Sequence, residues 1–387
     1  MKIYLKTEHL GTHPWIFRKM IHPPKKKLAP GTVVEVVSRS GKSLGRGFYH
    51  PSRTVAVRLL TSQPGELLDP QFFYNRLMQA KILREEILEI PKCSDSYRLI
   101  HGEADGLSGL VIDKYNRVIV IEPFSAGYLT FMDDIVSLLQ ELYPEARVGV
   151  RPDDKTEQQE GASFQQIAQK YPCPPSVKIQ ENRLKMEVNL STGHKTGYFL
   201  DQRENRAKIA ELSRGKEVWD LYCYTGGFAL SAALGGAKSV LGVDLDEKAL
   251  EIARKNALLN RVSVEFLHLD CFDFLRTMEK EGKQADLIIL DPAKLAGVRA
   301  ELSRALKTYN DINRLALGRV KKGGLLLSCS CSGLVSESQF LNILTNASRE
   351  AKVSFQIFYI GGASPDHPIR TDFLEGRYLK AILGRVL

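Results

Sequence analysis

The sequence predicts an α/β fold whose C-terminal half forms a doubly wound parallel sheet, preceded by a β-rich N-terminal domain and a small central α+β domain. From about residue 193 onward, continuous apolar runs alternate with segments of helical periodicity, which is typical of parallel strands joined by crossover helices. Strand and turn signals instead dominate the first 70 residues. A length of 387 residues also predicts more than one domain, because single cores rarely grow past about 250 residues.

The N-terminal domain is expected over residues 1–70. Runs rich in Val, Phe and Tyr predict its strands, and glycine-containing segments around Gly41 and Gly65 predict the turns that bound them. The predicted strands cover residues 32–37, 44–49 and 55–60.

The central domain is expected over residues 71–190. Apolar residues at steps of three and four predict a helix that begins near Pro70: Phe73, Leu77, Ala80, Leu83 and Ile87. Residues 151–175 are polar and contain prolines, which predicts a loop or a segment that contacts a partner. The other expected elements are a strand pair at 110–113 and 118–121, a helix at 128–142, a strand near Val148 and a hairpin over 177–190.

The C-terminal domain is expected over residues 191–387. Its apolar runs predict strands at 218–221, 239–244, 264–267, 286–290 and 324–328. The intervening periodic segments predict helices at 227–234, 247–260, 271–281, 302–319 and 337–350. A terminal hairpin over 355–360 and 378–383 completes the doubly wound, Rossmann-like sheet.

The chain carries an excess of positive charge. Its 54 Lys and Arg residues outnumber 45 Asp and Glu residues, which gives a net charge of +9. A polyanion such as nucleic acid is the natural partner of such a surface. The excess gathers between residues 11 and 60, where Glu35 is the single acidic residue and the basic side chains include His13, Arg18, Lys19, His22, Lys25, Lys26, Lys27, Arg39, Lys42, Arg46, Arg53 and Arg58.

The cysteines and the apolar runs argue against several other classes of protein. Six scattered cysteines without a CxxC pair predict neither a disulfide framework nor a structural zinc site. No window approaches the roughly 18 apolar residues of a membrane span, and the N-terminus lacks the apolar run of a signal peptide. We therefore expect a cytoplasmic, reduced protein.

Acidic residues end successive strands of the predicted sheet, at the edge where such folds bind ligands. Asp220 ends the first strand, Asp244 the second, and Asp270 follows the third. Neither a GxGxxG spacing nor a phosphate-binding loop is present, so a ligand with a pyrophosphate is not expected. The series instead fits an adenosyl group with a cationic sulfonium, bound by the acids and by the turn residues Tyr222, Thr225, Gly226 and Gly227. The alternative is that these acids only cap helices, and Asp270 directly precedes one.

Five motifs carry a resemblance to a known family over essentially the whole chain. They are residues 11–17 (GTHPWIF), 98–110 (RLIHGEADGLSGL), 195–203 (KTGYFLDQR), 291–294 (DPAK) and 328–334 (SCSCSGL). With them the chain resembles the bacterial 23S ribosomal RNA large subunit methyltransferase I family, S-adenosyl-L-methionine-dependent enzymes that methylate carbon 5 of cytosine.

The resemblance implies a PUA domain that grips RNA, a central α+β domain and a class I methyltransferase domain. It implies that residues 195–203 pack against S-adenosylmethionine, although these residues on their own predict only a polar loop entering a helix. The implied contacts are Phe199, Asp201, Gln202 and Arg203, and the expected cofactor-binding set also includes Leu245, Cys271 and Asp291.

Methylation of cytosine at carbon 5 requires a nucleophile near the cofactor, because this carbon is unreactive until a thiolate adds to carbon 6. Cys329 and Cys331 follow the strand at 324–328. In the family pattern the cysteine before Ser-Gly is shared, which makes Cys331 the expected nucleophile and Cys329 an inert, buried neighbour. Asp291 is expected to bond a flipped cytosine.

The residues after Asp291 refine this interpretation. Nitrogen methyltransferases usually carry an aromatic residue at the fourth position of the motif, where this chain has Lys294. Ala293 replaces the usual proline and leaves the loop less rigid. Lys294 is a candidate for contacting a phosphate or for lowering the pKa of Cys331.

Several alternatives stay open from the sequence. The same scaffold could methylate a base nitrogen, such as guanine N7, or could serve as a non-catalytic RNA-binding factor. The sequence does not decide which nucleotide is modified or whether the chain forms a homodimer. His101, His194 and His367 lack acidic partners at ligand spacing, so no metal is expected.

Overall fold

The structure is a computed structural model that describes residues 1–191 and 197–387. These residues form two compact units. The first contains Met1–Ile179, Val188–Tyr198 and Pro365–Gly376, and the second contains Gln180–Glu187, Phe199–Ser364 and Arg377–Leu387. The three-domain division of the chain stays a prediction.

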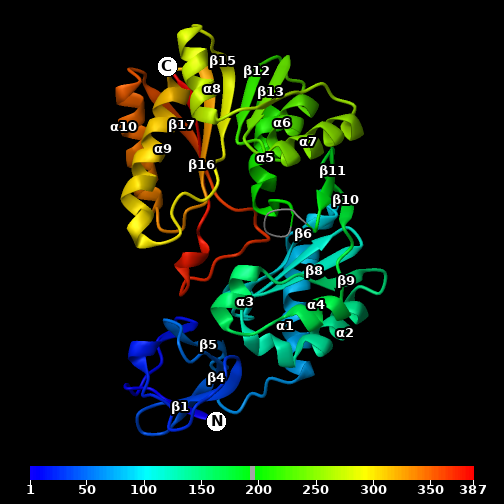
Figure 1. The fold of residues 1–387 in the computed structure, drawn as a ribbon, viewed down its shortest axis with the longest axis vertical. Coiled ribbons are helices and arrows are strands. Elements are labelled where there is room, and N and C mark those ends of the chain that lie inside the picture. Colours follow the sequence, from blue (N-terminus) through cyan, green and yellow to red (C-terminus); the bar gives the residue numbers. More distant parts are fainter. Residues whose placement is uncertain (192–196) are drawn as a thin grey trace. The chain divides into compact units, whose positions relative to one another are not determined.

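The first unit contains a five-stranded sheet built from the N-terminal residues (Figure 1). Its order is β1-β3-β4-β5-β2, and β1 runs parallel to β3 while the other neighbours are antiparallel. The strands are β1 (Lys2–Tyr4), β2 (Trp15–Phe17), β3 (Thr32–Val37), β4 (Ser43–Tyr49) and β5 (Val55–Thr61). The three predicted strands are therefore confirmed, and the sequence missed two strands of three residues each.

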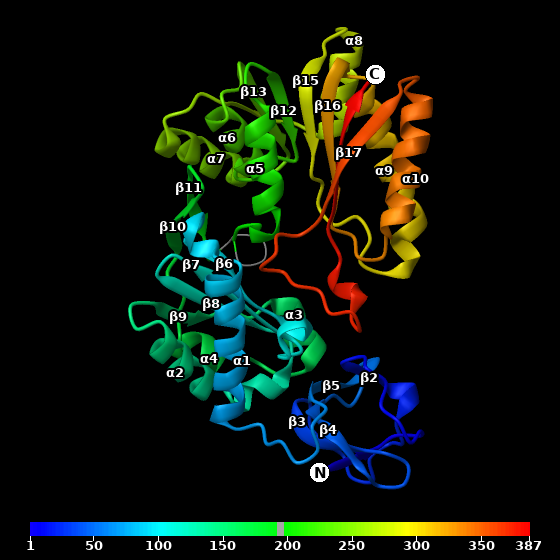
Figure 2. The same ribbon diagram turned by 180° about the vertical axis from the view of Figure 1, so that it is seen from behind.

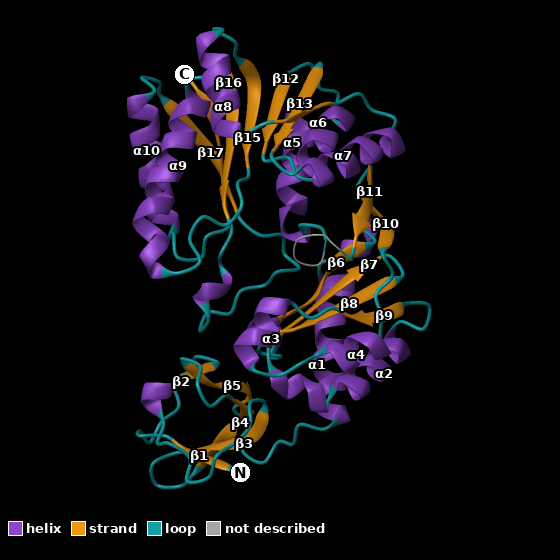
Figure 3. Ribbon diagram, in the orientation of Figure 1, coloured by secondary structure: helices purple, strands orange, loops and turns teal. Residues whose placement is uncertain are grey.

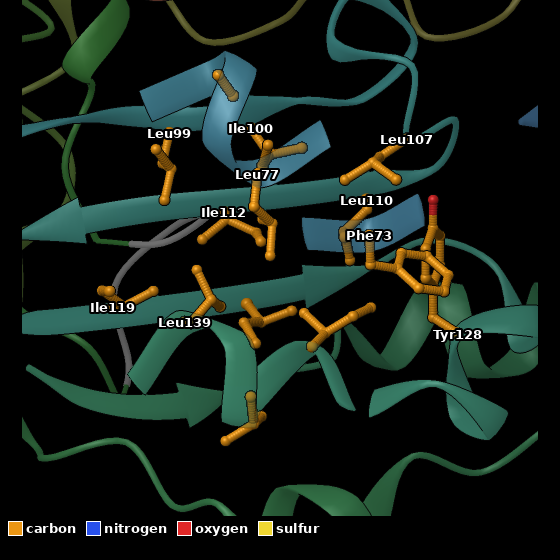
Figure 4. Close-up of a cluster of buried hydrophobic side chains, with 14 of the residues drawn as sticks. Phe73, Leu77, Leu99, Ile100, Leu107, Leu110, Ile112, Ile119, Tyr128 and Leu139 are labelled. Carbon is orange, nitrogen blue, oxygen red and sulfur yellow. The ribbon is translucent and has the colours of Figure 1, made fainter. Parts of the chain in front are cut away.

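A second sheet in this unit has the order β6-β7-β8-β9. Its strands are β6 (Ser96–His101), β7 (Leu110–Tyr115), β8 (Val118–Pro123) and β9 (Arg147–Val150). Helices α1 (Pro70–Ile82) and α2 (Met132–Leu142) contact each other, and their apolar residues join the strands in one buried cluster around Phe73, Leu77, Leu110 and Leu139 (Figure 4). The expected helix over residues 70–87 changes to a π-helical turn over its last five residues.

The prediction of a loop over residues 151–175 is wrong in part. Two short helices, α3 (Asp154–Glu160) and α4 (Gln165–Lys170), lie within this segment (Figure 3). Each contains too few residues for a helical period to stand out in the sequence. Glu160 stabilises the arrangement, because its buried carboxylate accepts the backbone N–H of Ala126 at 2.9 Å. Strands β10 (Ser176–Glu181) and β11 (Leu184–Asn189) then form the expected hairpin.

The second unit contains a seven-stranded sheet of order β14-β13-β12-β15-β16-β18-β17 (Figure 1). The first five of these strands are mutually parallel, and β18 is antiparallel to both of its neighbours. This is the expected doubly wound fold, with an antiparallel strand inserted near one edge. The strands are β12 (Glu217–Leu221), β13 (Ser239–Asp244), β14 (Glu265–His268), β15 (Ala285–Leu290), β16 (Val320–Ser330), β17 (Phe355–Gly361) and β18 (Lys380–Val386).

Six helices of the second unit cover this sheet (Figure 2). Helix α6 contacts β12 and β13, and helices α8 and α9 pack on the sheet. The helices are α5 (Arg203–Leu212), α6 (Gly227–Leu234), α7 (Glu247–Asn260), α8 (Cys271–Lys280), α9 (Leu302–Leu317) and α10 (Glu337–Glu350). The strand order reverses between β12 and β15, so a ligand site is expected beyond the carboxyl ends of these strands. Within the described residues, no helix is both long and apolar enough to cross a membrane.

Candidate cofactor and catalytic site

The predicted site residues meet at the carboxyl edge of the seven-stranded sheet. Leu221 is the register partner of both Val243 and Leu290, and Leu290 is the partner of Ser328. The residues that follow these positions on β12, β13, β15 and β16 therefore share one edge. Asp244, Asp291 and Cys331 all lie there.

The loop after β12 has a backbone conformation that suits the close approach of a ligand. Tyr222, Tyr224 and Gly226 have φ values of 66°, 50° and 88°. Left-handed backbone is costly for a residue with a side chain, so surrounding contacts must hold it. Asp244 supplies one such contact, because its Oδ2 accepts the backbone N–H of Tyr224 at 2.8 Å. A Cβ on Gly226 would lie 3.3 Å from both Ala253 and Phe266, which leaves little room for any other residue. Thr225 is buried beside it.

Asp220 is a buried carboxyl group with an incomplete set of hydrogen bonds. Its Oδ2 accepts the backbone N–H of Ala229 in α6 at 2.8 Å, whereas its Oδ1 has no hydrogen-bond partner in the part of the chain that the structure describes. Burial raises the pKa of Asp220 well above its usual value, and the nearby carboxylates of Asp291 and Asp244 raise it further. A buried acceptor of this kind indicates a missing donor or cation.

Asp244 keeps acceptor capacity for a ligand. Its Oδ1 accepts the N–H of Asp246 at 2.9 Å and its Oδ2 that of Tyr224. A carboxylate offers about four lone-pair positions, so two remain for the hydroxyl groups of a ribose. Leu245 is 59% exposed and Leu269, after the neighbouring strand, is 38% exposed. Both follow neighbouring strands at the same edge of the sheet, since Asp244 is the register partner of His268. The sequence reasoning missed Leu269, whose only signal is its place between β14 and Asp270.

Asp270 caps a helix, as the alternative interpretation expects. Its Oδ1 accepts the N–H groups of Phe272 and Asp273 at 2.8 and 3.2 Å, at the start of α8. The Cys271 side chain is buried in the core and donates to the carbonyl oxygen of Val243 at 3.8 Å. The Cys271 side chain is therefore shielded from a ligand, and the expected cofactor contact of this residue stays a prediction.

The segment before α5 lies against the same loop. The ring of Phe199 meets that of Tyr224 edge-on, with centroids 5.5 Å apart. The Phe199 carbonyl oxygen accepts from Arg206, which is held in turn by a buried ion pair with Glu181 at 2.6 Å. Buried Asp201 accepts from the hydroxyl of Tyr378 at 2.5 Å. Gln202 and Arg203 are also buried. His194, Lys195 and Thr196 of this motif region lie outside the described residues.

Cys331 and Cys329 differ sharply in their surroundings. Cys329 is fully buried on β16, and burial raises its thiol pKa well above the usual value. Cys331 is half-buried just beyond the strand, and its thiol donates to the carbonyl oxygen of Pro292 at 4.0 Å. The thiol therefore lies next to the loop that carries Asp291, as the nucleophile interpretation requires. Ala293 and Lys294 of that loop are exposed.

Two serines fix the backbone on either side of Cys331. Ser330 donates to the hydroxyl of Tyr309 at 3.0 Å, and the hydroxyls of Ser332 and Tyr309 are 3.1 Å apart. Ser332 also accepts the N–H groups of Leu295 and Ala296, both at 3.2 Å. These contacts join the cysteine loop to the loop after β15. The sequence reasoning missed Tyr309, since nothing in the sequence brings α9 to this edge.

The histidines lie in a different setting. His101 and His367 belong to the first unit, where their rings are 5.0 Å apart, and His101 contacts Arg98 at 3.2 Å. Over residues 1–191 and 197–387, no group of three or more His, Cys, Asp or Glu side chains could hold a metal ion.

The basic N-terminal side chains divide into two groups. Arg18 donates to the carbonyl oxygen of Arg53 at 3.0 Å, and Arg58 pairs with Glu103 at 3.2 Å, so these charges serve the fold. Exposed basic side chains instead line a groove of about 710 Å³ beside the 44% exposed Tyr4. We call it the basic groove, and its polar and aromatic lining is Lys2, Tyr4, His22, Lys25, Lys26 and Arg39.

Comparison with known proteins places this fold and site in a class. Residues 171–383 match the family described as S-adenosylmethionine-dependent methyltransferase, and residues 9–62 match a PUA-like domain. A solved methyltransferase bound to S-adenosylhomocysteine has the same fold over 100% of this chain and 99% of its own, with a TM-score of 0.81 at 21% identity. A methyltransferase structure from Streptococcus mutans covers both chains fully, with a TM-score of 0.79 at 20% identity. The protein is an S-adenosylmethionine-dependent methyltransferase with a PUA-like domain.

A closer relationship defines the family. The chain is 37% identical over 382 residues to the ribosomal RNA large subunit methyltransferase I of Escherichia coli strain K12, covering 98% of this chain and 96% of the relative. It belongs to the ribosomal RNA large subunit methyltransferase I family. The resemblance inferred from the five motifs is confirmed.

Proposed function

We propose that this protein forms 5-methylcytosine in 23S ribosomal RNA, with Cys331 as a covalent nucleophile. The observation that carries the proposal is the placement of a half-buried Cys331 thiol beside the Asp291–Pro292 loop, while the neighbouring Cys329 is fully buried. Because methylation of a base nitrogen requires no thiol, this arrangement favours the carbon-5 reaction. The name of the Escherichia coli relative supports the RNA substrate.

The residues at the sheet edge fit S-adenosylmethionine. Asp220 offers a buried acceptor without a hydrogen-bond partner among the described residues, and Asp244 keeps lone pairs for ribose hydroxyls. Leu245 and Leu269 would contact the adenine, and the loop at Gly226 gives the ligand access to the backbone. The bound group supplies an electrophilic methyl group on a sulfonium centre.

The protein's own residues then carry the covalent steps. The Cys331 thiolate adds to carbon 6 of a cytosine that has left its stack, and the electron pair of the 5,6 double bond moves toward carbon 5 and the ring. Carbon 5 would take up the methyl group as the bond from that group to the sulfonium sulfur broke, which would leave the sulfur as a neutral thioether. A base removes the proton from carbon 5, the double bond forms again, and the carbon–sulfur bond breaks to return the thiolate. Asp291 would hold the exocyclic amine of the base during these steps.

The basic groove would bind the RNA backbone. Lysine side chains pair with phosphates without reading sequence, and an exposed tyrosine can stack on an unpaired base. Because RNA is recognised through its shape as well as its charge, the groove would position the substrate rather than select the nucleotide. A cytoplasmic location, where ribosomal RNA is assembled in bacteria, is part of this proposal.

Two cysteine variants test the proposal. Cys331→Ala should abolish methyl transfer from labelled S-adenosylmethionine to 23S RNA while leaving the affinity for the methyl donor unchanged by calorimetry. Cys329→Ala, the matched control, should keep methyl transfer within severalfold of the wild type because its thiol is buried. RNA that contains 5-fluorocytidine should form a lasting adduct with the wild type, since the fluorine cannot leave as a proton. Full activity in Cys331→Ala would contradict the covalent route and favour nitrogen methylation.

A further inference from the structure

Lys380 places a lysine side chain inside the seven-stranded sheet. It lies on β18 opposite Ser330 of β16, and it is only 2% exposed. Its Nζ donates to the carbonyl oxygens of Ser332 and Tyr378, each at 2.7 Å. Lysine is almost never fully buried unless it is paired, because removing an ammonium group from water is costly. Two neutral carbonyl groups accept hydrogen bonds from this ammonium group, which has three N–H donors, but they do not neutralise its charge.

The ammonium group of Lys380 lies next to the loop that contains Cys331. Its cross-strand partner is Ser330 and one of its acceptors is Ser332, so the lysine bridges the two residues that flank Cys331. Burial lowers the pKa of Lys380 to about 8, and the nearby Cys331 thiol, when ionised, opposes that lowering. At neutral pH the lysine therefore carries its charge beside the thiol.

The other charged and titratable groups around this pair are mostly acidic. Carboxylates make it harder for a nearby thiol to ionise, so a positive charge is needed if a thiolate is to form at neutral pH. The other groups near the lysine, near Cys331 or near their immediate neighbours are five: Asp201, Asp291, Tyr309, Cys329 and Glu337. Lys380 supplies positive charge to this set.

We propose that Lys380 is a positioning residue that stabilises the Cys331 thiolate and fixes the loop that carries it. This inference rests on the proposed role of Cys331 as the nucleophile. The proton of the thiol passes to solvent, and the ammonium group keeps its own protons throughout. Through Tyr378, whose hydroxyl donates to Asp201, the same lysine joins the cysteine loop to the segment expected to bind the methyl donor.

Alkylation of Cys331 by iodoacetamide as a function of pH tests the inference without RNA. Peptide mass spectrometry follows the residue itself, so the other cysteines do not interfere. In Lys380→Gln, which keeps N–H donors but loses the charge, the midpoint pH for alkylation should rise by about one unit. The rate at pH 7 should fall about tenfold. Lys380→Arg should stay within about twofold of the wild type, and Lys322→Gln, which changes an exposed lysine on β16, should show no change.

The shape of the profile separates an electrostatic role from a purely structural one. A loosened loop would raise the plateau rate at high pH without moving the midpoint, whereas loss of the positive charge moves the midpoint. An unchanged midpoint in folded Lys380→Gln overturns the inference. If that variant does not fold, a midpoint in Lys380→Arg no lower than that of a free cysteine, about 8.5, overturns it as well. Retained methylation by Cys331→Ala would instead reject the nucleophile and leave the alkylation result standing.

Discussion

At the scale of single residues, two acids of the site differ in how completely they are hydrogen-bonded. Asp244 accepts two backbone N–H groups and holds the loop after β12, whereas Asp220 keeps one buried oxygen without a hydrogen bond among the described residues. A buried oxygen such as that of Asp220 lowers the stability of the folded protein, because no hydrogen bond compensates for its removal from water. Such a cost is common where a ligand completes the site.

The raised pKa of Asp220 gives a pH-dependent prediction for Asp220→Asn. The unfolded chain releases this proton near its ordinary pKa of about 3.9, while the folded protein holds it to a higher pH. The stability contributed by the group is therefore complete below the unfolded pKa and is lost as pH rises toward the folded pKa. Asparagine carries no titratable proton at this position, so it contributes no such dependence on pH. The free energy of unfolding of Asp220→Asn should therefore rise relative to that of the wild type as pH increases from 5 to 8, by up to about 1.4 kcal/mol per pH unit.

Urea unfolding without S-adenosylmethionine measures this difference. Glu279→Gln, at an exposed position on α8, is the matched control and should show no such trend. A constant difference between Asp220→Asn and the wild type across this range would show that the carboxyl group is not held protonated. The same variant should bind S-adenosylmethionine at least tenfold more weakly, because an amide, unlike the carboxyl group, cannot release a proton and become anionic when a cationic ligand binds.

At the scale of elements, α8 begins at a residue with two candidate roles. Asp270 caps the helix through two backbone N–H groups, and it also lies at the ligand edge of the sheet. Asp270→Ala should lower the free energy of unfolding by about 1 kcal/mol, whereas Asp270→Ser, which can still cap, should keep most of it. If the acid also contacts the adenine, both variants should lose affinity for S-adenosylmethionine. Thermal unfolding and calorimetry on the same samples separate the roles, and full affinity in Asp270→Ser would leave capping as the single role.

The elements also show what local patterns can predict. The predicted bounds of α6, α7 and α10 are those of the structure. Helices α7 and α10 have strong start signals, because Asp246 and Ser336 accept backbone N–H groups of their first turns. Ser336 forms a capping box with Gln339, which local sequence alone can specify. Strands β1 and β2 contain three residues each, too few for any period to appear. They exist because neighbouring strands of the sheet hold them.

At the scale of the whole molecule, the positively charged side chains fall into two groups, those in internal contacts and those exposed to solvent. Several arginines of the N-terminal domain serve internal contacts, while the lysines of the basic groove remain exposed. Counting charges along the sequence could not separate these groups, because both contribute equally to the total of +9.

The basic groove therefore yields a prediction for RNA binding. Lys25→Glu combined with Lys26→Glu should weaken binding to 23S RNA about tenfold or more at moderate salt. It should also reduce the slope of log affinity against log salt by about one to two, because fewer counterions are released. Filter binding across a salt series checks both values. The control changes Lys248 and Lys255, exposed on α7, to Glu, and an equal effect of that pair would place the RNA elsewhere.

The sequence by itself determined the α/β fold class and the alternation of strands and helices along the chain. It also determined which acids and cysteines follow the strands, because periodicity and the signals at the ends of elements are local. Only the tertiary structure decided which of those side chains are buried and which lie open at the edge of the sheet. It buried Cys329 and left Cys331 beside Pro292, although the two are separated by a single residue. It brought Lys380 and Tyr309 to the cysteine loop from β18 and α9. Burial and neighbours far along the chain set the charge state of a group, and no local pattern encodes them.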